Sequence, residues 1–293
     1  MKNIKYIVVF AVLIASGKLF AQQDPSYSMY RYNMNIINPA HAGSNGHTDL
    51  NLHIRNQWVD IDGAPETQTF SYTQPIGDKI GIGLSIVNDK VNIEKETRYT
   101  ADFSYKLQLS EKADLYFGVK AGAYTLDVDL LSVGVNDPLF DDNVSRTNGI
   151  FGAGAYLKMN KFYATLSIPN FLNGDRVAKT DDGSYAEGSD KMHVYTGAGY
   201  AFDLSENFEL TPALMARFVA GAPTSLDISA TVNMYKMVEA GVSYRLDESV
   251  SFLALIRAAD WLQFGYAYEA ATSNNLNGIS GGTHELMLQF RLN

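Results

Sequence analysis

Segments in which apolar and polar residues alternate recur along most of this chain. Near residue 230, Leu226 and Ile228 fall in one register, while Asp227 and Ser229 fall in the other. Successive side chains of a β-strand point to opposite faces of the sheet, so this two-residue period predicts a strand with one apolar and one polar face. The same period continues to the C-terminal residues 285–292.

The alternation predicts about fourteen strands. Their expected ranges are 47–58, 66–75, 79–89, 96–110, 113–126, 149–159, 161–169, 191–203, 206–218, 224–235, 237–246, 249–258, 261–271 and 282–292. A water-soluble two-sheet sandwich would also alternate, but it needs fewer strands. We therefore expect an all-β fold, a transmembrane antiparallel up-and-down β-barrel with lipid outside and polar side chains inside.

The predicted connections alternate in length. Tight turns are expected after even-numbered strands, at Gly77-Asp78, Ser110-Glu111-Lys112, Asn160, Leu204-Ser205 and Lys236. Longer connections follow odd-numbered strands, notably 127–148, 170–190 and 272–281, with Asp247-Glu248 as a short exception. Outer-membrane barrels have short periplasmic turns and long external loops, so we expect both termini in the periplasm.

Charged residues of both signs fall on the inward faces of the predicted strands. They are Arg55, Arg98, Asp102, Lys106, Lys120, Lys158, Asp227, Glu239, Arg245, Arg257, Glu269, Glu285 and Arg291. Such charges either pair across the lumen and fill it or surround water, and the sequence leaves both arrangements open.

The N-terminus has the features of a secretory signal, expected over residues 1–21. Lys2 and Lys5 precede an apolar run over 7–15, and cleavage is expected after Ala21. A retained anchor is the alternative, but the apolar run is short for a spanning helix.

A lead-in segment, residues 22–46, separates the signal from the barrel expected over 47–293. Tyr27, Tyr30, Met34 and Ile37 have helical spacing, and Asn38-Pro39 ends the run. We expect a short helical or hooked segment that lies under the barrel or enters its lumen. The sequence favours an ordered periplasmic lead-in over a plug.

The composition agrees with an exported barrel. The chain is 46% hydrophobic and includes 18 Tyr and 15 Phe, residues that suit strands and interfacial girdles. The formal charge of −9 falls to −12 when Lys2, Lys5 and Lys18 leave with the signal, which argues against a nucleic-acid partner. There are no cysteines, so disulfides and cysteine metal sites are excluded.

Four stretches of the chain resemble one known family. They are QDPSYSMY at 23–30 with NPAHAGS at 38–44; RNQW at 55–58 with GAP at 63–65 and TQT at 67–69; GIGL at 81–84 with ND at 88–89; and GYAY at 265–268 with TS at 272–273 and GTHE at 282–285. In this order and spacing they resemble the PorP/SprF family of type IX secretion system membrane proteins. Two positions depart from the family, which commonly has Tyr in place of His41 and Gly in place of Asp60.

The resemblance implies an outer-membrane barrel of the Bacteroidota that works with the type IX secretion machinery, among outer-membrane lipids. Some family members are paired with secreted surface proteins such as gliding adhesins, and the family implies no catalytic residue and no cofactor. The motif residues that we expect to contact a partner are Asp24, Pro25, Tyr27, Tyr30, Asn38, Pro39, Gly43, Arg55, Gln57, Trp58, Gly63, Ala64, Pro65, Gln68, His284 and Glu285. The alternative is that these residues hold the fold.

Other functions remain open alternatives. A passive porin or a transporter of small hydrophobic solutes would use the same barrel. A lipid hydrolase would need a serine beside His53, His193 or His284. Two groups of loop acids could bind a hard cation, but solvated acids are favoured. These acids are Asp137, Asp141 and Asp142 in one loop, and Asp175, Asp181, Asp182, Glu187 and Asp190 in another.

Overall fold

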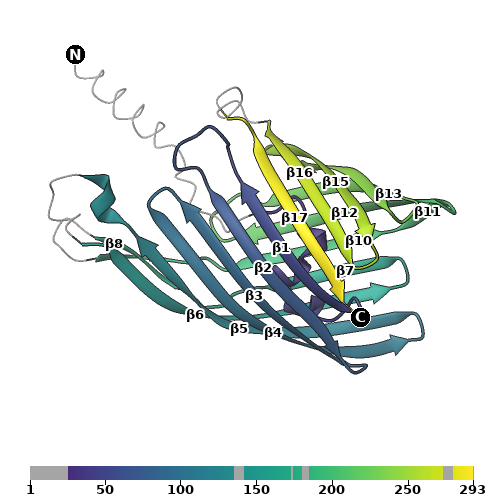
Figure 1. Ribbon diagram of the computed structural model, residues 1–293. Helices are drawn as coiled ribbons and strands as arrows, with labels where there is room; N and C mark the ends of the chain where they lie inside the picture. Colours follow the sequence, from purple (N-terminus) through teal and green to yellow (C-terminus); the bar gives the residue numbers. More distant parts are fainter. Residues whose placement is uncertain (1–25, 135–141, 173, 180–184, 273–279, 293) are drawn as a thin grey trace, which may run out of the picture.

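The computed structural model describes residues 26–134, 142–172, 174–179, 185–272 and 280–292. Within them, fourteen antiparallel strands form a closed barrel (Figure 1). These are β1 (Thr48–Asn56), β2 (Glu66–Ile76), β3 (Ile80–Val91), β4 (Glu94–Ser110), β5 (Ala113–Val128), β6 (Val144–Met159), β7 (Phe162–Ile168), β10 (His193–Tyr200), β12 (Phe208–Val219), β13 (Ser225–Met234), β14 (Val238–Arg245), β15 (Ser249–Ala259), β16 (Leu262–Ala271) and β17 (Thr283–Leu292).

The barrel closes by pairing of its first and last strands, β1 with β17, and β10 joins β7 to β12. A further strand, β11 (Phe202–Ser205), continues β10 beyond Ala201 and also pairs with β12. The strands β8 (Asp175–Lys179) and β9 (Tyr185–Ser189) pair as a separate two-stranded sheet. The predicted barrel and all fourteen predicted strands are therefore confirmed.

Two predicted boundaries are wrong. The β5–β6 ladder extends to the pair Val128–Val144, inside the loop expected over 127–148, because strand pairing continues where the alternation is no longer apolar. The turn expected at Leu204-Ser205 lies two residues later, since β11 continues through a register shift between Asp203 and Ser205. A β-bulge of this kind adds a residue to one strand without ending the ladder.

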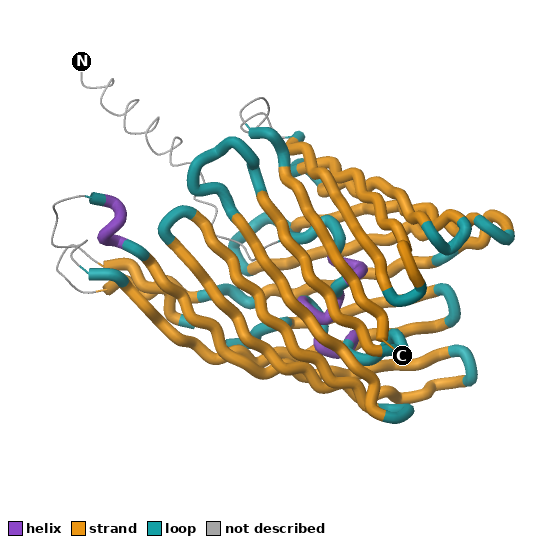
Figure 2. Tube along the Cα trace, in the orientation of Figure 1, coloured by secondary structure: helices purple, strands orange, loops and turns teal. Residues whose placement is uncertain are grey.

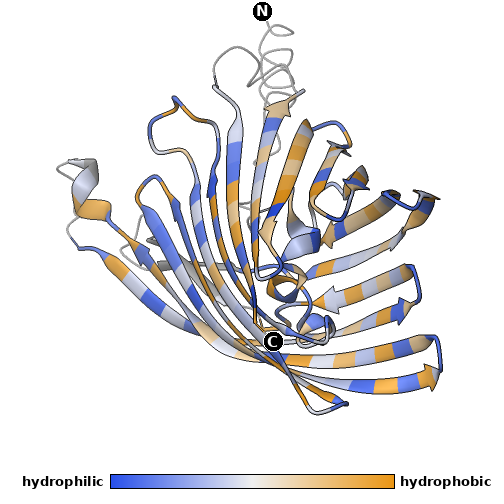
Figure 3. Cartoon of the chain, turned by 45° about the vertical axis from the view of Figure 1, so that its right-hand side comes forward, coloured by the Kyte–Doolittle hydropathy of each residue, from blue (hydrophilic) through white to orange (hydrophobic). Residues whose placement is uncertain are grey.

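The two faces of the barrel wall differ in polarity, which appears in Figure 3 as alternating bands along the strands. Outward side chains are large and apolar, and Leu84 and Phe252 are more than half exposed, at 53% and 56%. Inward side chains such as Ser71 and Arg55 are buried, at 0% and 1%. This inversion of a soluble protein's arrangement is what a membrane-spanning barrel requires.

The two ends of the barrel carry different connections (Figure 2). One end holds the C-terminus and the turns 77–79, 111–112, 160–161, 206–207, 235–237 and 260–261. We call it the short-turn end. The opposite, long-loop end holds the connections 57–65, 129–143, 169–192, 220–224 and 272–282, with two short exceptions at 92–93 and 246–248. No helix among the described residues is long and apolar enough to cross a membrane.

Residues 26–44, which we call the plug, lie inside the lumen, where Figure 2 shows their helical turns in purple. They form three single turns of 3-10 helix, η1 (Tyr30–Tyr32), η2 (Met34–Ile36) and η3 (Pro39–His41). Of the two placements that the sequence left open, the favoured periplasmic one is wrong for these residues. The placement depends on tertiary contacts, because buried polar groups of many strands bind the plug.

Candidate functional site

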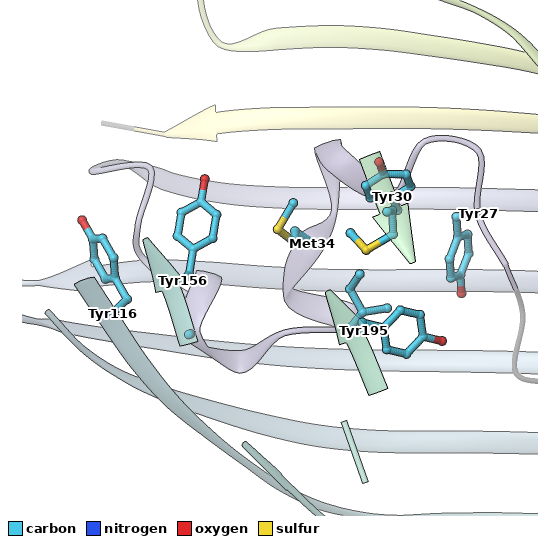
Figure 4. Close-up of a cluster of buried hydrophobic side chains, with 9 residues drawn as sticks. Tyr27, Tyr30, Met34, Tyr116, Tyr156 and Tyr195 are labelled. Atoms are coloured by element: carbon cyan, nitrogen blue, oxygen red, sulfur yellow. The ribbon is translucent and has the colours of Figure 1, made fainter. Parts of the chain in front are cut away.

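The plug buries an apolar face against aromatic side chains of the wall. Tyr27, Tyr30, Met34 and Ile37, the residues with predicted helical spacing, all belong to this cluster. Their partners on the wall are Tyr116, Tyr156, Tyr195 and Met215 (Figure 4). Tyrosine suits this position because its ring packs as an apolar body, and the Tyr27 hydroxyl lies 3.1 Å from Thr69 Oγ1.

Glu285 on β17 holds the start of the plug. Its Oε1 accepts a hydrogen bond from the Ser28 backbone N–H at 2.7 Å, and its Oε2 accepts one from the Met29 N–H at 3.2 Å. The same carboxylate pairs with Arg55 and lies 3.2 Å from Nε2 of His53. Glu285 is 1% exposed, so each of these contacts forms away from solvent.

A buried ionic network spreads from Glu285 around this part of the lumen. Arg55 Nη2 lies 3.3 Å from Glu269 Oε1, and Arg245 Nη1 lies 3.4 Å from Glu269 Oε2. Arg245 also binds Asp227 with two hydrogen bonds, of 2.7 and 3.2 Å. The five groups comprise two cations and three anions, so the plug N–H groups on Glu285 help to balance the excess negative charge.

The middle of the plug is held from the other strands. Arg31 donates to Oγ1 of Thr231 at 3.0 Å and pairs with Glu239, which also accepts a hydrogen bond of 2.7 Å from the Tyr32 hydroxyl. On the opposite wall, Lys120 Nζ donates to the Asn35 carbonyl at 3.1 Å. Inward charges therefore pair with the plug and with one another.

Near the short-turn end the backbone of the plug touches the wall. The Asn38 side chain donates to Thr165 Oγ1 at 2.7 Å and accepts from the Ala40 N–H at 2.9 Å, which caps η3. A Cβ on Gly118 would lie 2.2 Å from the Ala40 nitrogen, and a Cβ on Gly154 would lie 2.0 Å from the Asn38 Oδ1. Gly118 requires glycine because the plug backbone approaches the wall so closely, and a side chain at Gly154 would displace the Asn38 amide.

His41 is the titratable group of the plug that faces a basic residue. Its ring lies 5.0 Å from the Tyr156 ring, edge to face. Burial, reinforced by the nearby charge of Lys158, lowers the pKa of His41 to about 4. The docked plug therefore holds a neutral imidazole at physiological pH.

Residues 57–65, which contain several of the family-motif residues and which we call the motif loop, fold onto the connection that precedes β17. The Val59 N–H donates to the Gly282 carbonyl at 2.9 Å, and the Gly281 N–H donates to the Val59 carbonyl at 2.8 Å. The loop contains Trp58 and Asp60 with positive φ angles of 45° and 75°, a strained conformation for residues other than glycine. It therefore presents a fixed surface at the long-loop end.

The predicted site residues fall into three groups. The structure brings Tyr27, Arg55 and Glu285 together at the plug, and it also buries Tyr30, Asn38 and Pro39 there, while Gly43 is half-buried. Gln57, Trp58, Gly63, Ala64 and Pro65 lie in the motif loop. Gln68 and His284 face outward, and Asp24 and Pro25 lie outside the described residues.

Some residues of the site carry no motif signal. Asp227, Glu239 and Glu269 bind the plug or its anchors, and only their inward register marks them in the sequence. Two of the candidate histidines also have partners in the structure. His53 faces Glu285 in the lumen, and His284 shares a hydrogen bond of 2.8 Å with the Tyr266 hydroxyl.

The described residues contain no group of three or more His, Asp or Glu side chains that could hold a metal ion. Two cavities of the lumen have volumes of about 60 and 30 Å³, and both are lined in part by plug residues. A cavity needs roughly 10–15 Å³ for each water, so these two spaces admit a few water molecules.

Comparison with protein families gives one extensive match. The model described as "Type IX secretion system membrane protein PorP/SprF" matches residues 19–290. No curated protein sequence matches the chain.

Comparison with solved structures gives outer-membrane proteins of low sequence identity. The Acinetobacter baumannii outer membrane protein Omp33 is 9% identical, with a TM-score of 0.50 over 84% of this chain and 98% of that one. A Pseudomonas aeruginosa FadL homologue is 12% identical, with a TM-score of 0.49 over 83% and 89%. The Ralstonia pickettii toluene transporter TbuX is 11% identical, with a TM-score of 0.49 over 87% and 92%. The likeness to Omp33 is one of fold.

Proposed function

Because the chain belongs to the PorP/SprF family of type IX secretion system membrane proteins, we propose that this outer-membrane barrel supports secretion or surface attachment of an exported protein. It would do so by binding that protein or the periplasmic machinery, not by conducting solutes. Gliding adhesins of the Bacteroidota are the proposed kind of cargo.

The observation that carries this proposal is the plug. Its polar contacts reach β2, β3, β5, β13, β14, β16 and β17. A conducting pore needs a continuous aqueous path, whereas these contacts fill the lumen at several heights. A barrel with a filled lumen is better suited to a scaffold that presents fixed loops.

The proposed orientation places the short-turn end and the C-terminus in the periplasm, as in other outer-membrane barrels. The motif loop 57–65 then faces outward from the cell, where an attached surface protein would meet it. We further propose that residues 1–21 are a signal peptide and that the mature chain begins at Gln22.

Gene deletion tests the proposal. Surface display of each type IX cargo would be measured by labelling intact cells and by analysis of the culture medium, in the deletion strain and in a strain complemented with the wild-type gene. We expect at least one cargo to lose display or attachment and complementation to restore it. Unchanged display of every cargo would refute the proposal.

The alternative, a passive porin or a transporter of small hydrophobic solutes, makes a different electrical prediction. Purified protein in a planar bilayer should show no steady open current if the plug stays docked. A large and steady conductance of the wild-type barrel would favour a porin.

A further inference from the structure

The outer wall of the barrel carries a groove of about 750 Å³ over the closure of the barrel, from β3 through β1 and β17 to β15. Its floor and sides are the outward residues Leu52, Ile54, Phe70, Ile256, Phe264 and Leu286. The volume and the apolar lining are those of a small-molecule site, although the groove opens toward the membrane.

The groove lies directly behind the docked plug. His53, Thr69, Gly265 and Met287 line it from the wall. On the inner side, the Tyr27 hydroxyl lies 3.1 Å from Thr69 Oγ1, and Met29 packs on Met287. The wall is therefore supported from inside at the place where its outer surface is hollowed.

Polarity changes along the groove in one direction. Leu52 pairs with Phe70 and Leu288, so this row is apolar. One row closer to the long-loop end, Ile54 pairs with Gln68, and Gln68 pairs with Asn88. Tyr266 lies in this second row, so hydrogen-bonding side chains gather at one end of the groove.

The polar side chains at this end keep hydrogen-bonding capacity. Gln68 Nε2 donates to Glu66 at 2.8 Å, and Asn88 Nδ2 donates to Thr97 at 2.8 Å. Each amide has a second N–H donor and a carbonyl acceptor. These groups suit the polar head of an amphiphile, while the rest of the groove suits its chain.

We propose that this groove binds a lipid of the leaflet at the long-loop end, with its acyl chain along Leu52 and Phe264 and its head at Gln68, Asn88 and Tyr266. The order of polarity decides for a lipid, because in that leaflet the head lies toward the long-loop end and the chain points toward the bilayer centre. The inference is independent of the proposed secretion function.

Native mass spectrometry of the full chain, purified in mild detergent, tests the proposal. Ala254 is an outward, exposed residue in the groove, so Ala254→Trp would fill it. Ala121, also outward and exposed, lies on β5 away from the groove, and Ala121→Trp is the matched control. We expect a bound lipid on the wild type and on Ala121→Trp, and loss of that lipid from Ala254→Trp.

A second variant tests the polar end without adding bulk. Gln68→Leu combined with Asn88→Leu should weaken lipid retention, because the head loses its partners while the chain site is intact. Absence of a lipid from the wild type, or equal retention by all variants, would overturn the proposal. A wild-type dimer that Ala254→Trp converts to a monomer would also overturn it, since a second copy would then cover the groove.

Discussion

Replacement of Glu285 by glutamine should release the plug from the wall. The substitution keeps the shape of the side chain but removes its negative charge. In the wild type this carboxylate accepts hydrogen bonds from the Ser28 and Met29 N–H groups and pairs with Arg55. Removal of one partner from a buried ion pair costs about 3–5 kcal/mol. Because a factor of ten corresponds to about 1.4 kcal/mol, the undocked fraction of the plug should rise by at least two orders of magnitude.

The absence of cysteines makes this effect measurable. Met29 is 0% exposed, so a cysteine in the Met29→Cys variant reacts with a maleimide only when the plug undocks. The reaction rate in Met29→Cys would be compared with that in Met29→Cys combined with Glu285→Gln. A cysteine at the exposed position Asn45 serves as the control for general accessibility.

A second control separates plug release from loss of the barrel. Glu66 is exposed, and Glu66→Gln removes a charge of the same kind without touching the plug. The far-ultraviolet circular dichroism of each variant reports whether the strands remain. An unchanged labelling rate at residue 29 in folded Glu285→Gln would refute the view that this carboxylate anchors the plug.

Three further predictions follow from the same site. Gly118→Val should prevent docking, because its Cβ would lie 2.2 Å from the Ala40 nitrogen. Maleimide labelling at residue 29 should then be fast, whereas Ala121→Val on the outward face should leave that labelling slow. Docking should weaken as the pH falls from 6.5 to about 4, because the docked His41 resists protonation while the undocked His41 binds a proton. The difference between the two pKa values corresponds to at most about 3 kcal/mol of docking free energy. His41→Phe should abolish this pH dependence when the labelling rates at residue 29 are normalised to those of the Asn45→Cys variant. Arg31→Met should leave Glu239 without its cationic partner and lower the midpoint of plug undocking in urea, an effect that Arg146→Met on the exposed part of β6 should not reproduce.

Much of the barrel is predictable because its pattern is local. Each strand faces lipid on one side and polar groups on the other, so neighbouring residues such as Leu226 and Asp227 differ in polarity. The strand ends were less predictable beyond the membrane, as in β5 and β6, where backbone pairing continues without an apolar face. The spacing of Tyr27, Tyr30, Met34 and Ile37 also predicted which plug side chains are buried, although the turns are 3-10 and not one α-helix.

The barrel, its inward charges and the apolar face of the lead-in segment are predictable because each depends on residues close together in the chain. The entry of residues 26–44 into the lumen and the pairing of several inward charges there are not, because they depend on contacts between distant strands. Arg55 and Glu285 are 230 residues apart, and they meet because β1 pairs with β17 when the barrel closes. The carboxylate then accepts the plug N–H groups, so closure of the barrel creates the site that holds its own N-terminal segment.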